Sequence, residues 1–231
     1  MTAHFRSKGH LLTPALKKMR QTRAKSLLQW HAKNRHENLL FTDKKIFTIE
    51  EQYNKIYAQK SLEVHSERAG GHHTSYVMVG WGMSHWGVTP LHFCEKGVKT
   101  GAQVYQEDVL QGAVKPVNMT VFNGQKWVFQ QDSVPAHKAN TTQEWLQRNV
   151  PALISSEDWP SGRSNLNPLD YNLWAVLENM ACCKCHNSLD NLKRSLVKAV
   201  AEIPLETVRA AIAEWPEHLK ACIGAEGGHF E

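Results

Sequence analysis

The chain has 231 residues, of which 42% are hydrophobic, with 8 Trp and 7 Phe among them. This is enough apolar material for one large domain, or one domain with an appendage, and it excludes a wholly disordered chain. No run of 18 apolar residues occurs, and the first residues lack the apolar stretch of a signal peptide. We therefore expect a soluble, intracellular protein with no membrane partner. Five Cys are too few for a disulfide scaffold.

The formal net charge of +5 is unevenly distributed. Residues 1–40 carry nine Lys or Arg against one Glu, which gives +8 and leaves −3 for the rest of the chain. Because Lys and Arg that neutralise phosphates release counterions, this arm is predicted to bind a polyanion. The alternative is a solvated face of a helix that packs on the body. The basic residues are Arg6, Lys8, Lys17, Lys18, Arg20, Arg23, Lys25, Lys33 and Arg35.

Hydrophobic periodicity predicts a helix, then a set of strands, then alternating helices and strands. The first helix begins after Thr13, which can cap it, with Pro14 at its first position. Four strands, a helix, a strand, a helix and a short strand follow. Their predicted ranges are 41–49, 52–58, 75–81 and 87–93 for the four strands, then 99–114, 121–131, 136–148 and 153–154.

The last third of the chain is predicted to be helical. Asn167 can cap a helix that has Pro168 at its first position. Apolar residues recur at helical spacing up to Met180, again over residues 189–203, and again from Pro204 to Trp215. We interpret these stripes as core rather than as cofactor sites.

Three Asp residues lie where predicted elements begin or end. Asp43 and Asp132 each follow an apolar run, and Asp170 opens a helix, with 88 and then 37 residues between them. Carboxylates at such positions of an α/β sheet can converge on divalent metal ions, and Mg²⁺ prefers hard oxygen ligands. The alternatives are structural. Asp132 suits a helix cap. Asp170, at the third helical position, can accept a hydrogen bond from the backbone N–H of the capping residue.

The residues around these three Asp form ordered blocks. They read Phe41-Thr42-Asp43, Gln130-Gln131-Asp132-Ser133-Val134-Pro135-Ala136-His137 and Asn167-Pro168-Leu169-Asp170-Tyr171-Asn172-Leu173-Trp174. With the 37-residue spacing, they resemble the signature of mariner-type transposases, in the mariner/Tc superfamily. The stretches His92-Phe93-Cys94-Glu95-Lys96-Gly97 and Gly227-Gly228-His229-Phe230-Glu231 are similar to further parts of that family. The resemblance runs from about residue 39 to the C-terminus.

The resemblance implies the α/β class and a ribonuclease H-like fold, a mixed five-stranded sheet flanked by helices, with a basic N-terminal helical arm. It divides the chain into the arm at 1–40 and a DDD transposase catalytic domain at 41–231. Family members carry a helix-turn-helix DNA-binding part ahead of this domain, and residues before 11 leave no room for one. We therefore expect weak DNA binding with little sequence preference.

The implied function is metal-dependent phosphodiester cleavage and strand transfer in cut-and-paste DNA transposition, the work of a polynucleotidyl transferase with endonuclease activity. The resemblance assigns Asp43, Asp132 and Asp170 as catalytic ligands of Mg²⁺, for which Mn²⁺ can substitute. The expected partners are transposon-end and target DNA and a second copy of the chain, and the expected location is the nucleus. Candidates for contacts to DNA or to the ligands are His137, Lys138, Arg163 and Asn167. A local packing role is the alternative for His137.

The chain departs from the family pattern at three places. Lys44 stands where Glu is usual, and on a strand its side chain should point away from Asp43. Gly80 replaces an expected Trp, with Trp81 beside it. Two further changes, in the loop before the third Asp, can misplace that ligand. They are Ser164 and Asn165, which replace Pro-Asp.

These departures support an alternative function, a catalytically inactive transposon remnant or a host-recruited protein that binds DNA or protein. An unrelated nuclease on the same fold is a third hypothesis. The segment from Cys182 to His186 contains a Cys-x-x-Cys spacing, but zinc needs four ligands and no second pair is present. Cys222 and the pair His72-His73 are only remote candidates for the missing ligands, so a zinc site is not expected.

Overall fold

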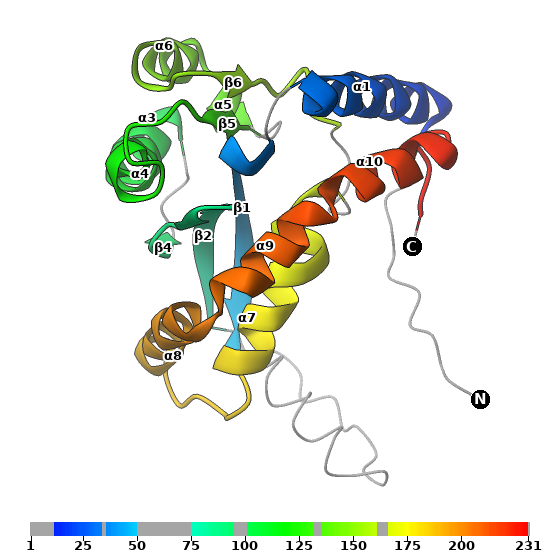
Figure 1. The fold of residues 1–231 in the computed structure, drawn as a ribbon. Coiled ribbons are helices and arrows are strands. Elements are labelled where there is room, and N and C mark those ends of the chain that lie inside the picture. The colour runs from blue at the N-terminus through cyan, green and yellow to red at the C-terminus, as the bar shows by residue number, and fades with distance from the viewer. Residues whose placement is uncertain are drawn as a thin grey trace, which may run out of the picture.

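The computed structural model describes residues 12–33, 36–49, 75–94, 101–131, 135–160 and 166–230. Its strands form one mixed sheet in the order β3-β2-β1-β5-β6, with β4 also paired to β2. Helices cover both faces of the sheet (Figure 1). The strands are β1 (Leu39–Thr48), β2 (Tyr76–Ser84), β3 (Gly87–Val88), β4 (His92–Cys94), β5 (Val128–Gln130) and β6 (Leu153–Ile154).

The helical elements include two π-helical segments, η2 and η4, each continuous with an α-helix. In chain order they are α1 (Pro14–Lys33), η1 (His36–Asn38), α3 (Ala102–Val104), η2 (Tyr105–Val114), α4 (Lys115–Thr120), α5 (Pro135–Lys138), α6 (Asn140–Asn149), η4 (Leu169–Leu173), α7 (Trp174–Ala181), α8 (Leu189–Glu202), α9 (Leu205–Ala213) and α10 (Trp215–Gly224). None of the described helices is long and apolar enough to cross a bilayer.

Within the described ranges the sheet has six strands, one more than the predicted five. β1 pairs antiparallel with β2 and parallel with β5, and β5 pairs parallel with β6. β3 and β4 both pair antiparallel with β2 and share one edge position. The strand predicted over 87–93 is thus split at Pro90, which has no N–H for the ladder. The strand predicted over 52–58 lies outside the described residues.

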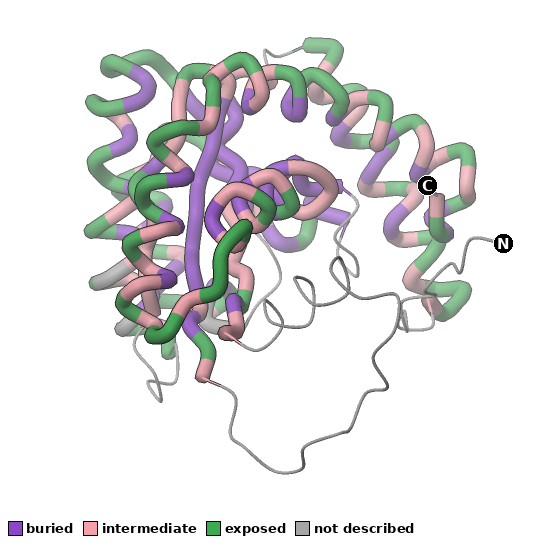
Figure 2. The backbone as a smooth tube through the Cα atoms, turned by 90° about the horizontal axis from the view of Figure 1, so that it is seen from below, coloured by how far each residue is buried: buried purple, intermediate pink, exposed green. Residues whose placement is uncertain are grey.

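Side chains alternate along the central strands and build a separate core on each face of the sheet. Phe41 and Phe47 of β1, with Trp81 of β2, join the core made with η4 and the C-terminal helices. Leu40 faces the opposite way and joins the core made with η2, α4 and α6. Figure 2 shows the buried residues gathered along the strands and on the inward sides of the helices.

Several predicted elements have other bounds in the structure. The helix predicted over 136–148 is divided into α5 and α6, because Ala139 between them has an extended backbone. The strand predicted over 121–131 is wrong before Val128, because Asn123 and Gly124 adopt left-handed backbone angles (φ 49° and 75°) and form a turn. The helix predicted over 99–114 runs on to Thr120, through Pro116. Pro116 is the second residue of α4, just after the junction with the π-helical segment η2.

The N-terminal helix α1 packs along α10, as Figure 1 shows. The predicted cap is present, because the Leu16 N–H donates to Thr13 Oγ1 at 3.3 Å. Arg20 is fully buried and donates to the carbonyl of Gly227 at 3.0 Å, while Arg23 donates to the carbonyl of Trp159 at 3.0 Å. Part of the basic arm therefore packs on the body, while its other basic side chains in α1 are exposed. The domain boundary at residue 40 stays a prediction.

Candidate active site

Thr42, which precedes Asp43 on β1, connects three parts of the chain. Its N–H donates to Gln130 Oε1 and its hydroxyl donates to the Gln130 carbonyl, both at 3.4 Å. Its carbonyl accepts a hydrogen bond from Asn167 Nδ2 at 3.0 Å. Residues from the end of β5 and from the start of η4 are thereby held against the middle of β1.

These contacts bring together the segments that carry the three predicted ligands. Gln130 comes two residues before Asp132, and Asn167 comes three residues before Asp170. Asp132 itself lies outside the described residues, between β5 and α5. The convergence predicted from sequence is therefore seen in the flanking residues of all three segments.

Asn167 also builds the helix start that carries Asp170. Its Oδ1 accepts from the N–H of Leu169 at 3.1 Å, and its carbonyl accepts from the N–H groups of Asp170 and Tyr171 at 2.9 and 3.2 Å. The predicted cap is confirmed. The same side chain thus caps η4 and binds β1, which fixes Asp170 relative to the strand that bears the first Asp.

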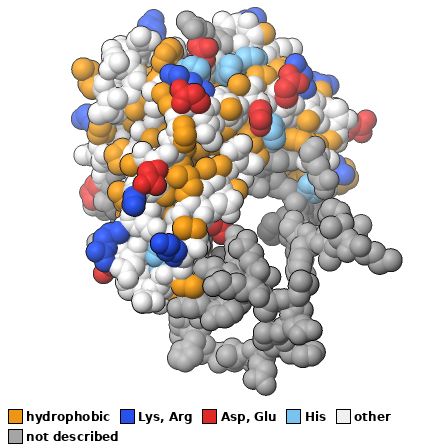
Figure 3. All heavy atoms as spheres, turned by 60° about the horizontal axis from the view of Figure 1, so that its bottom comes forward, with side chains coloured by type: hydrophobic (Ala, Val, Ile, Leu, Met, Phe, Trp, Pro, Cys, Tyr) orange, Lys and Arg blue, Asp and Glu red, His pale blue; other side chains and the backbone are white. Residues whose placement is uncertain are grey.

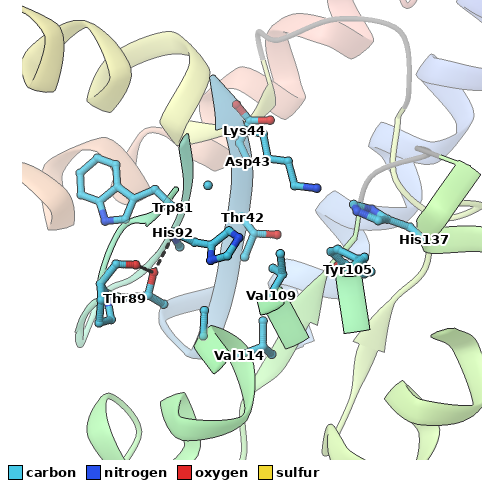
Figure 4. A pocket seen from close by; sticks show the side chains of 14 residues that line it. Thr42, Asp43, Lys44, Trp81, Thr89, His92, Tyr105, Val109, Val114 and His137 are labelled. Atoms are coloured by element: carbon cyan, nitrogen blue, oxygen red, sulfur yellow. Dashed lines mark hydrogen bonds between the residues drawn. The ribbon is translucent and has the colours of Figure 1, made fainter. Parts of the chain in front are cut away.

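Asp43 faces α7. Its Oδ2 accepts a hydrogen bond from the indole Nε1 of Trp174 at 2.7 Å. Lys44 faces the other side of the sheet, with its ammonium 5.0 Å from the ring centroid of Tyr105 (Figure 4). The prediction that Lys44 points away from Asp43 is confirmed.

Gly80 and Trp81 face opposite sides of the sheet. Trp81 is the register partner of Asp43, and its ring lies 5.7 Å from that of Trp174, on the α7 side. Gly80 is the partner of Lys44 and lines a small cavity of about 40 Å³ on the other side. The departure at these positions therefore places the indole against α7 and leaves the Lys44 side open.

His137 makes the contacts of a packing residue. It is 6% exposed and stacks on Tyr105, with ring centroids 4.1 Å apart. Its carbonyl accepts from Gln143 Nε2 at 2.6 Å. Lys138 is the last residue of α5. Arg163 lies outside the described residues, together with Ser164 and Asn165.

The donors suited to a hard divalent cation are the carboxylates of the three acidic segments. Within the described ranges, no three His, Cys, Asp or Glu side chains are grouped to hold a metal ion, and Asp132, the second predicted ligand, lies outside those ranges. Cys183 and Cys185 are exposed, whereas Cys222 is buried in α10, where burial raises the pKa of its thiol despite the opposing effect of Arg20.

Sequence reasoning missed the polar role of Trp174, because an indole within an apolar helix is typical of core. A Trp one helical turn after a predicted ligand, with an N–H that needs a partner when buried, was the available signal. Tyr105 was also missed. It starts η2, and no polar periodicity marks it.

No protein-family model matches the chain. The sequence is 30% identical over 152 residues to the transposase of the transposable element Tcb1 of Caenorhabditis briggsae, a match that covers 65% of this chain and 52% of that protein. It is also 33% identical over 104 residues to the Tc1 transposase of Caenorhabditis elegans, a match that covers 45% of this chain and 37% of that protein. The chain spans about half the length of the Tcb1 transposase.

The chain shares its fold with solved structures of the Mos1 transposase. The catalytic domain of Mos1 mariner transposase matches with a TM-score of 0.76 at 18% identity, over 97% of this chain and 100% of that one. The mariner Mos1 paired-end complex with Mg matches with a TM-score of 0.78 at 18% identity, over 100% of this chain and 68% of that one. The predicted ribonuclease H-like α/β fold is confirmed.

Proposed function

We propose that this chain is the catalytic domain of a DNA transposase, which cleaves phosphodiester bonds and transfers the freed strand with divalent metal ions. The observation that carries the proposal is the meeting of the three acidic segments at Thr42, through Gln130 and Asn167. Homology to the Tcb1 transposase and a shared fold with Mos1 support it.

The residues that would hold the metal are Asp43, Asp132 and Asp170. Their donors are carboxylate oxygens, which suit Mg²⁺ and also Mn²⁺. Bound metal ions would activate the attacking oxygen and neutralise charge on the phosphate. The chain itself supplies the framework for this chemistry, because Thr42 and Asn167 fix the strand and the helix start on which two of the carboxylates lie.

DNA is the proposed substrate and partner, both as transposon ends and as target. The Mos1 structures of this fold include a paired-end complex with Mg. On the face seen in Figure 3, acidic and basic side chains are interspersed with apolar ones, which gives no extended basic surface there. The exposed lysines of α1, which are Lys17, Lys18, Lys25 and Lys33, are better suited to phosphates. We propose action as a homodimer on paired ends, and the nucleus as the location.

The test is nicking of supercoiled plasmid and of pre-cut DNA in Mg²⁺ or Mn²⁺. The wild-type chain should cut in either metal, and Asp43→Asn, Asp132→Ala and Asp170→Asn should each lose cutting. Asp190→Asn, at an exposed aspartate of α8, is the control and should cut normally. A folded wild-type chain that cuts in neither metal would support the inactive remnant or host-recruited binding protein instead.

A further inference from the structure

Three buried tryptophans surround the candidate site and its core, and they use their indole N–H groups differently. Trp81 and Trp174 are each 2% exposed, and Trp215 is 0% exposed. The N–H groups of Trp81 and Trp215 have no hydrogen-bond partner in the described part of the chain. That of Trp174 donates to Asp43 at 2.7 Å, so one indole is oriented by a carboxylate and two only by packing.

The ring of Trp174 is fixed by the same sheet that carries Asp43. Trp81, the register partner of Asp43, lies 5.7 Å from it at an interplanar angle of 54°. Phe47, on the same face of β1, lies 5.9 Å away at 68°. With two rings against it and almost no exposed surface, the indole cannot turn without disturbing the core, so its N–H has one direction.

Trp174 also belongs to the helical run that carries Asp170. It starts α7, which continues directly from η4, and it comes four residues after Asp170. Four residues are about one helical turn. One side chain therefore joins the strand bearing the first proposed ligand to the helix bearing the third.

We infer that Trp174 is a positioning residue for metal binding by Asp43, an inference that rests on the proposed function. Its N–H fixes the plane of the Asp43 carboxylate and hence the direction from which a metal ion can approach. Partners that orient ligating groups affect metal affinity by about 10–100-fold when removed. Trp174 itself contacts no metal or DNA in this role.

The test replaces a single chemical group, the indole N–H of Trp174. Substituting Trp174 with 3-benzothienylalanine puts sulfur in place of the N–H and keeps the shape of the bicyclic ring. We expect the Kd for Mn²⁺, measured by electron paramagnetic resonance of the free ion, to rise about 10–100-fold with little change in Tm. Trp174→Phe also removes the N–H and should raise the Kd by a similar factor.

The matched control is the same replacement at Trp215, whose N–H has no partner among the described residues. It should leave the Kd unchanged. An unchanged Kd after replacement at Trp174, or an equal rise at both positions, overturns the positioning role. The proposed function fails separately, if wild-type protein binds no Mn²⁺ or if Asp43→Asn binds it as well as wild type does.

Discussion

The side chain of Asn167 makes two different bonds, one that caps η4 and one that holds β1. Asn167→Ala removes both, and we expect it to lower the free energy of unfolding by about 2–3 kcal/mol, because the cap is removed and a carbonyl is left unsatisfied. The rate of metal-dependent nicking should fall about a hundredfold, because Asp170 loses its tether to the strand. Urea unfolding and plasmid nicking measure the two effects.

Asn167→Asp separates the two bonds. It keeps the oxygen that accepts from Leu169 but cannot donate to the Thr42 carbonyl. We expect nearly the same loss of nicking as in Asn167→Ala, and no smaller loss of stability, because a buried carboxylate oxygen would face the Thr42 carbonyl oxygen. Wild-type nicking by the Asp variant would show that the bond to β1 does not position Asp170.

Gly227 has a positive φ of 76°, and a Cβ there would lie 1.9 Å from the carbonyl oxygen of Lys17 in α1. Gly227→Ala should therefore destabilise the chain by at least about 3 kcal/mol, from backbone strain and from displacement of α1. Gly124 has nearly the same φ, 75°, and open space around it. Gly124→Ala should cost only about 1 kcal/mol. Urea unfolding of both variants measures the difference, and equal losses would exclude the close approach as the cause.

At the scale of elements, the end of α1 and η1 meet through two histidines. The rings of His31 and His36 lie 4.5 Å apart, and both face Trp215. Burial lowers the pKa of each, with a further contribution from Lys220 for His31. For His36, His31 and His85 lower the pKa further and Glu37 opposes them.

These lowered pKa values predict that stability depends on pH. The unfolded chain keeps the ordinary value of 6.5, so below it the unfolded state binds more protons, and stability falls as pH drops through 6.5 toward the folded pKa. The Tm of wild type should decrease between about pH 7.5 and about pH 5.5 by more than that of the double variant His31→Gln, His36→Gln. His229→Gln, at an exposed residue, should behave as wild type. Equal decreases in all three proteins would contradict this.

The elements were largely predictable where one rule decided them. Pro204 separates α8 from α9, as the apolar periodicity on either side of it indicates. Thr13 caps α1. The split at Pro90 and the turn at Asn123 and Gly124 were not predicted, because the apolar residues on either side continue the strand pattern. The π-helical form of η2 and η4 leaves no mark in a pattern of apolar residues.

At the scale of the whole molecule, the candidate site could be proposed from sequence because its three Asp lie in short motifs. The roles of Asp43 and Asp170 stay predictions, and the structure brings their segments together through Thr42 and Asn167. The partners that orient them, Trp174 and Thr42, come from contacts across 131 and 125 residues of sequence. Such pairings depend on which strands and helices are neighbours, and the spacing of motifs along the sequence does not reveal this.

The basic surface of α1 gives a prediction for the whole molecule. Replacing Lys17, Lys18 and Lys25 with Gln should weaken binding to duplex DNA of any sequence. A plot of the logarithm of the DNA association constant against the logarithm of the salt concentration has a negative slope. Its magnitude should decrease by about 0.9 for each phosphate that is no longer neutralised, about 2.7 in all. Lys198→Gln with Lys220→Gln is the control, because both lysines pair with neighbouring Glu. Fluorescence anisotropy at several salt concentrations measures this, and an unchanged slope would exclude α1 from the DNA contact.

The bond from Arg20 to Gly227 joins residues 207 positions apart in the chain. A ribosome adds roughly 5–20 residues per second, so α1 exists for roughly 10–40 s before its partner helix is made. During that interval the side chain of Arg20 has no access to its carbonyl partner and can bind other acceptors. We expect α1 to be the last part of the nascent chain to dock, and a polyanion to be its first competitor for that docking.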